Sequence, residues 1–159
     1  RQAQRNFSHY SSVSVRMNKS LRYSLVLLRI SLGWLFFYAG ITKVFDSSWS
    51  AAGYLQSAKT FSGVYQWLAS ASNIGWINFV NEWSLVLIGA ALIVGFRTRI
   101  AALLGAGLML LYYFPILDFP YVGEHSLLVD EHIIYIFSLL ILTRMRAGEY
   151  WGLDSRMRH

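Results

Sequence analysis

Four long apolar segments alternate with short polar stretches along the chain. They cover about residues 23–44, 76–96, 100–117 and 126–143. Each is close to the ~20 residues that an α-helix needs to cross the hydrocarbon core of a bilayer. Their apolar residues run continuously instead of alternating, which favours helices over the strands of a barrel. The pattern predicts an all-α fold, namely a four-helix transmembrane bundle with a short-helical extracytoplasmic loop.

The connections between these segments differ in length. Residues 97–99 form a very short turn, so the second and third segments should pack as an antiparallel hairpin. Residues 46–75 form a long connection whose apolar positions are spaced like one face of a helix (Leu55, Ala58, Phe61, Tyr65 and Leu68). We expect one or two short helices there. They would lie in the membrane interface as an anchor, or fold over the bundle as a lid.

Composition supports an integral membrane protein. Hydrophobic residues make up 55% of the 159 residues and charged residues only 14%, whereas a soluble domain has about 25% charged residues. The net charge of +6 does not predict a nucleic-acid partner, because the basic residues gather at the ends of apolar segments. The absence of cysteine excludes disulfides, thiol catalysis, thiolate metal sites and Cys-attached haem.

Charge also predicts the topology. Of the 14 Lys and Arg residues, only Lys43 and Lys59 fall on the side of the long connection, and Arg29 lies within the first segment. The positive-inside rule therefore places both termini in the cytoplasm. We expect a multi-pass protein of the plasma membrane. The predicted parts are a basic cytoplasmic tail (1–22), a membrane domain (23–144) containing the loop 46–75, and a second tail (145–159). Residues 1–22 also resemble a transit peptide in composition, and the alternative is a tail held by anionic lipid.

Two cations lie on one face of the first segment. Arg29, Gly33, Phe36, Gly40 and Lys43 follow a 4-3-4-3 spacing, which is a single helical stripe. A cation inside the membrane costs about 2.5–3.5 kcal/mol, so it should face the bundle interior or a polar cavity. The alternative is that both side chains extend to the lipid headgroups.

Acidic residues stand near the predicted outer ends of two other segments. Glu82 lies six residues inside a helix that begins at Trp76, or starts one that begins near Trp83. Asp130 either caps a helix that starts there or lies one turn inside a helix that starts at Ser126. The topology brings Lys43, these carboxylates and His132 to a similar depth. We predict an intramembrane polar cluster of Arg29, Lys43, Glu82, Asp130, Glu131, His132 and Tyr135; the alternative is a structural staple.

The cluster points to proton chemistry more than to metal or haem. Residues 130–132 are adjacent on a helix and point about 100° apart, so they cannot share one ion, and no second axial histidine suits haem. A quinone headgroup needs a hydrogen-bond donor and a route for protons, which His132, Tyr135 and Glu82 could supply. The aromatic wall would be Trp34, Phe36, Phe37 and Tyr38. Glu82, His132 and Asp130 are the candidate catalytic residues, and quinone is the candidate cofactor.

Several stretches resemble one family. "LRISLGWLFFYAGITKV" (28–44) and "EWSLVLIGAALIVGFRTRIAALLGA" (82–106) resemble the first three helices of the DoxX-like family of small membrane proteins. "WSAAGYL" (49–55) and "LLVDEHIIYIFSLLILTRMRAGEYWGLD" (127–154) resemble its archaeal branch, related to the small subunit of thiosulfate:quinone oxidoreductase.

The resemblance implies a four-helix membrane bundle with Arg29, Lys43, Glu82 and His132 at recurrent polar positions. It implies a small membrane subunit of a quinone-linked redox complex that works with other membrane subunits. A second subunit belongs to that enzyme, so the alternative is a non-catalytic accessory or scaffold subunit of a larger membrane oxidase or monooxygenase.

Overall fold

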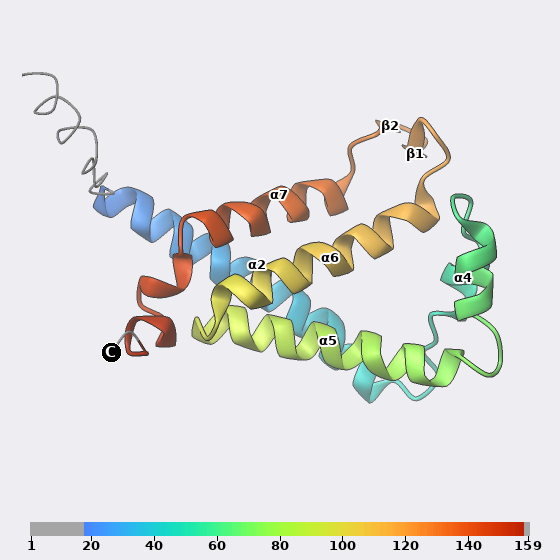
Figure 1. The fold of residues 1–159 in the computed structure, drawn as a ribbon, viewed down its shortest axis with the longest axis horizontal. Coiled ribbons are helices and arrows are strands. Elements are labelled where there is room, and N and C mark those ends of the chain that lie inside the picture. The colour runs from blue at the N-terminus through green and yellow to red at the C-terminus, as the bar shows by residue number, and fades with distance from the viewer. Residues whose placement is uncertain (1–17, 158–159) are drawn as a thin grey trace, which may run out of the picture.

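The computed structural model describes residues 18–157, and most of them are helical (Figure 1). Most of the predicted basic tail and the last two residues of the second tail lie outside the described residues. The long helices are α2 (Lys19–Phe45), α5 (Ile74–Val94), α6 (Thr98–Ile116) and α7 (Glu131–Arg144). The short elements are α3 (Ala52–Gln56), α4 (Ser62–Leu68), β1 (Tyr121–Gly123), β2 (Ser126–Leu127), η1 (Ala147–Glu149) and η2 (Leu153–Ser155).

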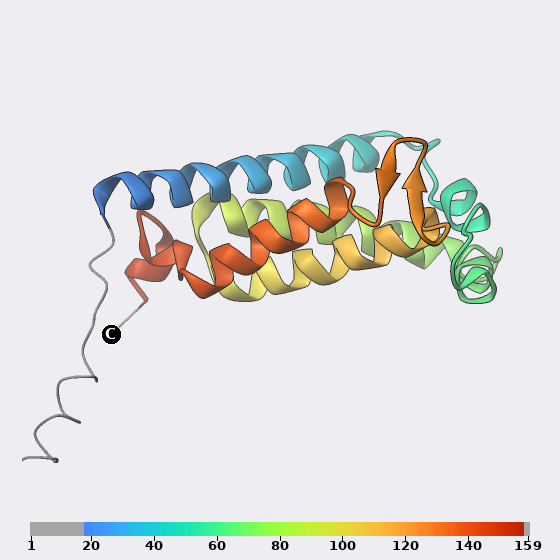
Figure 2. The same cartoon turned by 90° about the horizontal axis from the view of Figure 1, so that it is seen from above.

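The four long helices lie side by side as a bundle. Helix α2 packs along α5, and α6 packs along α7, while the α5–α6 contact joins the two pairs (Figure 2). One end of the bundle carries α3, α4 and the β1–β2 hairpin, and we call it the loop end. The other end carries the start of α2, the α5–α6 turn and the C-terminal η1 and η2, and we call it the terminal end (Figure 1).

Three helices are long and apolar enough to cross a membrane, namely α2, α5 and α6. The predicted fourth span over 126–143 is not confirmed as a span. Residues 126–127 form β2, and α7 begins only at Glu131 because the Asp130 side chain accepts hydrogen bonds from the backbone of His132 and Ile133. The 14 residues of α7 rise about 21 Å, less than the ~30 Å hydrocarbon core. The structure thus selects the capping alternative for Asp130.

Small residues bring α2 and α5 close together. A Cβ added to Gly40 would lie 2.7 Å from the backbone nitrogen of Val86, and one added to Gly33 would lie 2.9 Å from that of Ile93. The stripe predicted from sequence faces the bundle interior, because Arg29, Gly33, Phe36 and Gly40 are all buried. Close backbone approach of this kind stabilises helix pairs in lipid, where no hydrophobic effect drives association.

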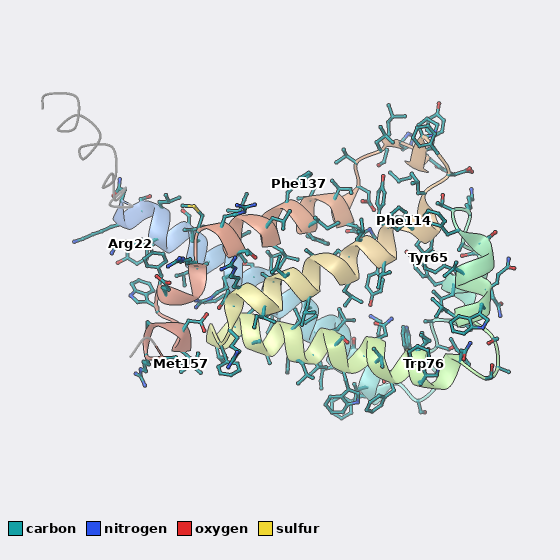
Figure 3. All side chains as sticks on the ribbon, in the orientation of Figure 1. Arg22, Tyr65, Trp76, Phe114, Phe137 and Met157 are labelled. Atoms are coloured by element: carbon teal, nitrogen blue, oxygen red, sulfur yellow. The ribbon has the colours of Figure 1, made fainter. Side chains whose placement is uncertain are left out.

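The long connection 46–75 folds as two short helices, as expected. Their buried side chains, including Leu55 and Tyr65, form a second small core with Phe114 of α6, separate from the main bundle core. Figure 3 shows Tyr65 and Phe114 at the loop end. The Tyr65 hydroxyl donates to the Leu111 carbonyl at 3.0 Å, and Lys59 forms an ion pair with Asp118 at 2.8 Å. The connection is therefore tied onto the loop end of α6.

Candidate functional site

A cavity of about 740 Å³ opens at the loop end of the bundle. Every long helix contributes to its wall, together with the long connection and the hairpin. The lining residues include the charged and polar side chains of Lys43, Asn81, Asp130, Glu131 and His132 and the aromatic rings of Trp49, Tyr54 and Tyr112. A volume between about 300 and 1,000 Å³ is typical of small-molecule sites.

Asp130 and His132 form a compact pair on the wall of this cavity. The carboxylate of Asp130 caps α7 through Oδ1, and its Oδ2 lies 2.5 Å from Nδ1 of His132. Their side chains are only 11% and 16% exposed. The contact between Nδ1 and the carboxylate fixes the orientation of the imidazole ring. Nε2 of His132 makes no hydrogen bond with any residue of the described chain, and it remains available to a ligand.

Aromatic side chains form another part of the cavity wall. The rings of Tyr112 and His132 stand perpendicular to each other, with 6.1 Å between centroids. The Tyr112 hydroxyl donates to Oδ1 of Asn81, and the Tyr54 hydroxyl donates to the Tyr112 carbonyl. Burial raises the pKa of Tyr54 to about 12. Its phenol therefore stays neutral at physiological pH and holds α3 against α6.

Lys43 reaches the cavity from the last turn of α2. Its Nζ donates to the Ala39 carbonyl at 2.9 Å and lies 5.3 Å from the centroid of the Trp49 ring. An ammonium has three donors, so two remain beyond the one given to Ala39. Glu82 of α5 is the carboxylate that acts electrostatically on Lys43.

Glu82 and Tyr135 lie beside the cavity and do not line it. Since α5 begins at Ile74, Glu82 is more than two turns inside the helix, which settles the alternatives left by the sequence. Within the described residues Glu82 forms no ion pair at contact distance. Tyr135 lies one turn further along α7 and its hydroxyl is 3.5 Å from Oε2 of Glu131, whose side chain does line the cavity.

Arg29 does not belong to this cluster, so its predicted place there is wrong. It lies about 21 Å along α2 from Lys43, toward the terminal end. Its side chain is 1% exposed, and Nη1 donates to the carbonyls of Ala147 at 2.8 Å and Tyr150 at 3.1 Å. The C-terminal segment folds back over it, and the carboxylate of Asp154 acts on its charge. Extension of Arg29 to the lipid headgroups is excluded by the same burial.

The prediction that aromatic residues of the first apolar segment form a wall of the site is also wrong. Phe36 is buried in the bundle core, and Trp34 and Tyr38 are exposed on the outside of α2. The wall is built instead from Trp49, Tyr54 and Tyr112, and the site includes Asn81. Sequence signals for two of these exist. Asn81 precedes Glu82, and Tyr112 falls near the end of the third apolar segment at the depth predicted for the cluster.

The described residues contain no group of three or more His, Asp or Glu side chains placed to hold a metal ion. The carboxylate and imidazole of Asp130 and His132 are instead engaged with each other.

Comparison with known proteins identifies a family. Residues 24–116, more than half of the chain, match the DoxX family. No curated protein and no solved structure matches. The matched range covers α5, α6 and most of α2, and it ends before the hairpin and α7. The Lys43, Asn81 and Tyr112 side of the cavity thus lies within the matched range, whereas Asp130, Glu131 and His132 lie beyond it.

Proposed function

The chain belongs to the DoxX family, and from that premise we propose that it is a small membrane subunit of a quinone-linked redox complex, of the thiosulfate:quinone oxidoreductase type. The proposal includes four membrane crossings, with both termini in the cytoplasm and the loop end outside. Helix α7 alone rises about 21 Å, so the fourth crossing would also include the residues 126–130 that precede it. The basic residues at the terminal end support this orientation.

The observation that carries the proposal is the loop-end cavity with the Asp130–His132 pair on its wall. A quinone headgroup is a flat ring with two carbonyl acceptors. The cavity offers aromatic faces for the ring, namely Trp49, Tyr54 and Tyr112. Nε2 of His132 and the free N–H groups of Lys43 are the donors for the carbonyls. The residues present therefore fit such a headgroup in size, shape and hydrogen-bonding capacity.

The chain's own residues bind, orient and move protons. When bound, a quinone supplies two-electron, two-proton redox chemistry. Asp130 holds the imidazole of His132 in one orientation, and Nε2 is the atom that would exchange a proton with a ligand in the cavity. Glu131 is exposed and lines the same cavity, and it connects the pair to water. Glu82 balances the charge of Lys43 from behind the wall. The electron donor belongs to a partner subunit.

Quinone binding tests the proposal directly. The purified protein is titrated with a short-chain ubiquinone in detergent, and tryptophan quenching is followed. Loss of the hydrogen bond from Nε2 leaves a quinone carbonyl unsatisfied, which costs about 1–3 kcal/mol, so binding should weaken about 5- to 150-fold in His132→Gln. His125→Gln is the matched control, because His125 is exposed in the hairpin turn and does not line the cavity. Trp49→Phe should remove most of the quenching.

The proposal fails if the purified protein shows no saturable quenching, or if His132→Gln and His125→Gln bind quinone equally well. Asp130→Asn separates the role of Asp130 in orienting the His132 ring from its role in capping α7. The amide still offers an oxygen to cap α7, so the helix content should persist while quinone binding weakens, because the carboxylate no longer holds Nδ1 of His132.

A non-catalytic accessory subunit is the second candidate. An apolar groove of about 500 Å³ runs between α5 and α6 on the outside of the bundle, beside Leu87, Leu104 and Gly107. Such a groove suits a helix of a larger membrane enzyme. This function predicts that gently extracted protein migrates with a partner on native gels. It also predicts that His132→Gln leaves the turnover of that complex unchanged.

A further inference from the structure

We propose that the terminal end holds a binding site for one anionic phospholipid. Its phosphate would lie between Lys19 and Arg22, and an acyl chain would follow the exposed face of α2. This site lies at the opposite end of the bundle from the quinone cavity and does not depend on it. Figure 3 shows Arg22 at the same end as Met157, close to the C-terminal segment.

A second cavity defines the headgroup site. It has a volume of about 350 Å³ and lies between the first turns of α2 and residues 149–151. Lys19 and Arg22 line it, and neither forms an ion pair within the described part of the chain. The Arg22 guanidinium is held 5.3 Å from the centroid of the Tyr150 ring. Glu149 also lines the cavity, but its carboxylate lies 3.5 Å from Arg146. The balance of charge in the cavity is therefore positive.

The aromatic walls of the cavity place it at headgroup depth. Tyr23 and Trp151 meet edge to face, with 4.8 Å between centroids. Tyrosine and tryptophan concentrate at membrane–water interfaces because one part of each ring system is apolar and another is polar. Helix α2 has 27 residues and rises about 40 Å, so its first turn extends beyond the ~30 Å hydrocarbon core. Lys19 and Arg22 thus lie where lipid phosphates lie.

An apolar track leads from this cavity along α2. Tyr23, Leu27, Ile30 and Trp34 follow a 4-3-4 spacing and form one helical face. Their exposed fractions lie between 40% and 65%. Tyr23 belongs both to the cavity and to the track, so the basic site and the apolar face are continuous. A free phosphate ion would use only the cations. A diester phosphate carrying an acyl chain uses both features, and this continuity is why the proposal names a phospholipid.

The test uses the full-length protein in nanodiscs that contain phosphatidylglycerol in a phosphatidylcholine background. Bound lipid is counted by native mass spectrometry after release. Each basic residue near a membrane surface contributes about 1 kcal/mol, so Lys19→Gln/Arg22→Gln should lose phosphatidylglycerol affinity about 25-fold. Arg144→Gln is the control, because it removes one charge at the same end of the bundle without touching this cavity. It should retain the lipid.

Equal retention of phosphatidylglycerol by the double variant and the control overturns the proposal. So does displacement of the lipid by millimolar inorganic phosphate with phosphate binding in its place, because that result indicates a free-anion site. A second measurement needs no variant. Phosphatidylglycerol with a photoreactive acyl chain should label residues 19–34 of the unsubstituted protein more than the matched phosphatidylcholine does. Equal labelling by the two lipids also overturns the proposal.

Discussion

Replacement of Asp154 by alanine should loosen the terminal end of the bundle. The Asp154 carboxylate accepts hydrogen bonds from the backbone of Arg97 at 2.6 Å and Thr98 at 2.9 Å, which are orphan donors at the start of α6. Hydrogen bonds to a charged group are worth about 1.5–3 kcal/mol each, and water can replace part of both because Asp154 is only half-buried. We expect a loss of about 2–4 kcal/mol in the free energy of unfolding.

Two further substitutions test whether the loss of stability comes from the Asp154 carboxylate. Asp154→Asn keeps one acceptor oxygen but loses the charge that acts on buried Arg29, so it should lose about half as much stability. Arg156→Gln changes an exposed side chain in the same segment and should stay within about 0.5 kcal/mol of the parent.

Unfolding in mixed detergent micelles, followed by far-UV circular dichroism, measures these differences. Limited trypsin digestion adds a local readout, because release of the C-terminal segment should expose the bond after Arg146. If Asp154→Ala unfolds at the same denaturant fraction as Arg156→Gln and resists trypsin equally, the carboxylate does not hold this end and our reasoning is refuted.

Two other predictions concern the α2–α5 contact and Tyr54. A Cβ on Gly89 would overlap the backbone nitrogen of Phe37, whereas one on Gly107 would meet nothing within 4 Å. Gly89→Ala should therefore destabilise the bundle by about 1–3 kcal/mol in the same unfolding assay, and Gly107→Ala should not destabilise it; equal effects would contradict the packing argument. The phenol of Tyr54 should titrate near pH 12 instead of 10, seen as the difference in phenolate absorbance between the parent and Tyr54→Phe. Because the folded-state pKa is raised, its stabilising contribution is present below pH 10 and is lost as the pH rises toward 12; a difference spectrum that titrates at pH 10 would contradict this burial.

The long helices were predictable from hydropathy because lipid exposure leaves a continuous apolar run. The first and third predicted segments, 23–44 and 100–117, differ from α2 and α6 by a few residues at each end. The fourth helix was misplaced at its start. Residues 126–130 are mostly apolar in sequence, yet they form a strand and a cap, since the local hydrogen bonds of Asp130 outweigh the hydropathy of its neighbours.

The sequence predicts residues of the candidate site only where residues of different helices meet because they lie at the same depth in the membrane. Lys43, Asp130 and His132 meet at one cavity because their helices present these residues at the same end. Arg29 was misassigned because its partners are backbone carbonyls of a C-terminal segment that folds back along the bundle. Hydropathy does not indicate that a C-terminal segment folds back along the bundle. Asn81 and Tyr112 were missed because a neutral amide and a phenol do not interrupt an apolar run as a charge does.

The two polar assemblies of the chain differ in whether their hydrogen-bonding capacity can reach a ligand. At the terminal end, Nη1 of Arg29 and both carboxylate oxygens of Asp154 are engaged by backbone groups. Among the described residues, Nε of Arg29 and Oγ1 of Thr98 have no hydrogen-bond partner, but both atoms are shielded from solvent. At the loop end, no residue between 18 and 157 accepts a hydrogen bond from Nε2 of His132 or from two of the N–H groups of Lys43, and these groups lie beside open volume. Buried polar groups that are satisfied or sealed fix a fold, whereas unsatisfied groups that face a cavity bind ligands. Arg29, the intramembrane cation nearer the terminal end, therefore stabilises the fold, whereas the cavity on which our proposed function rests lies at the loop end.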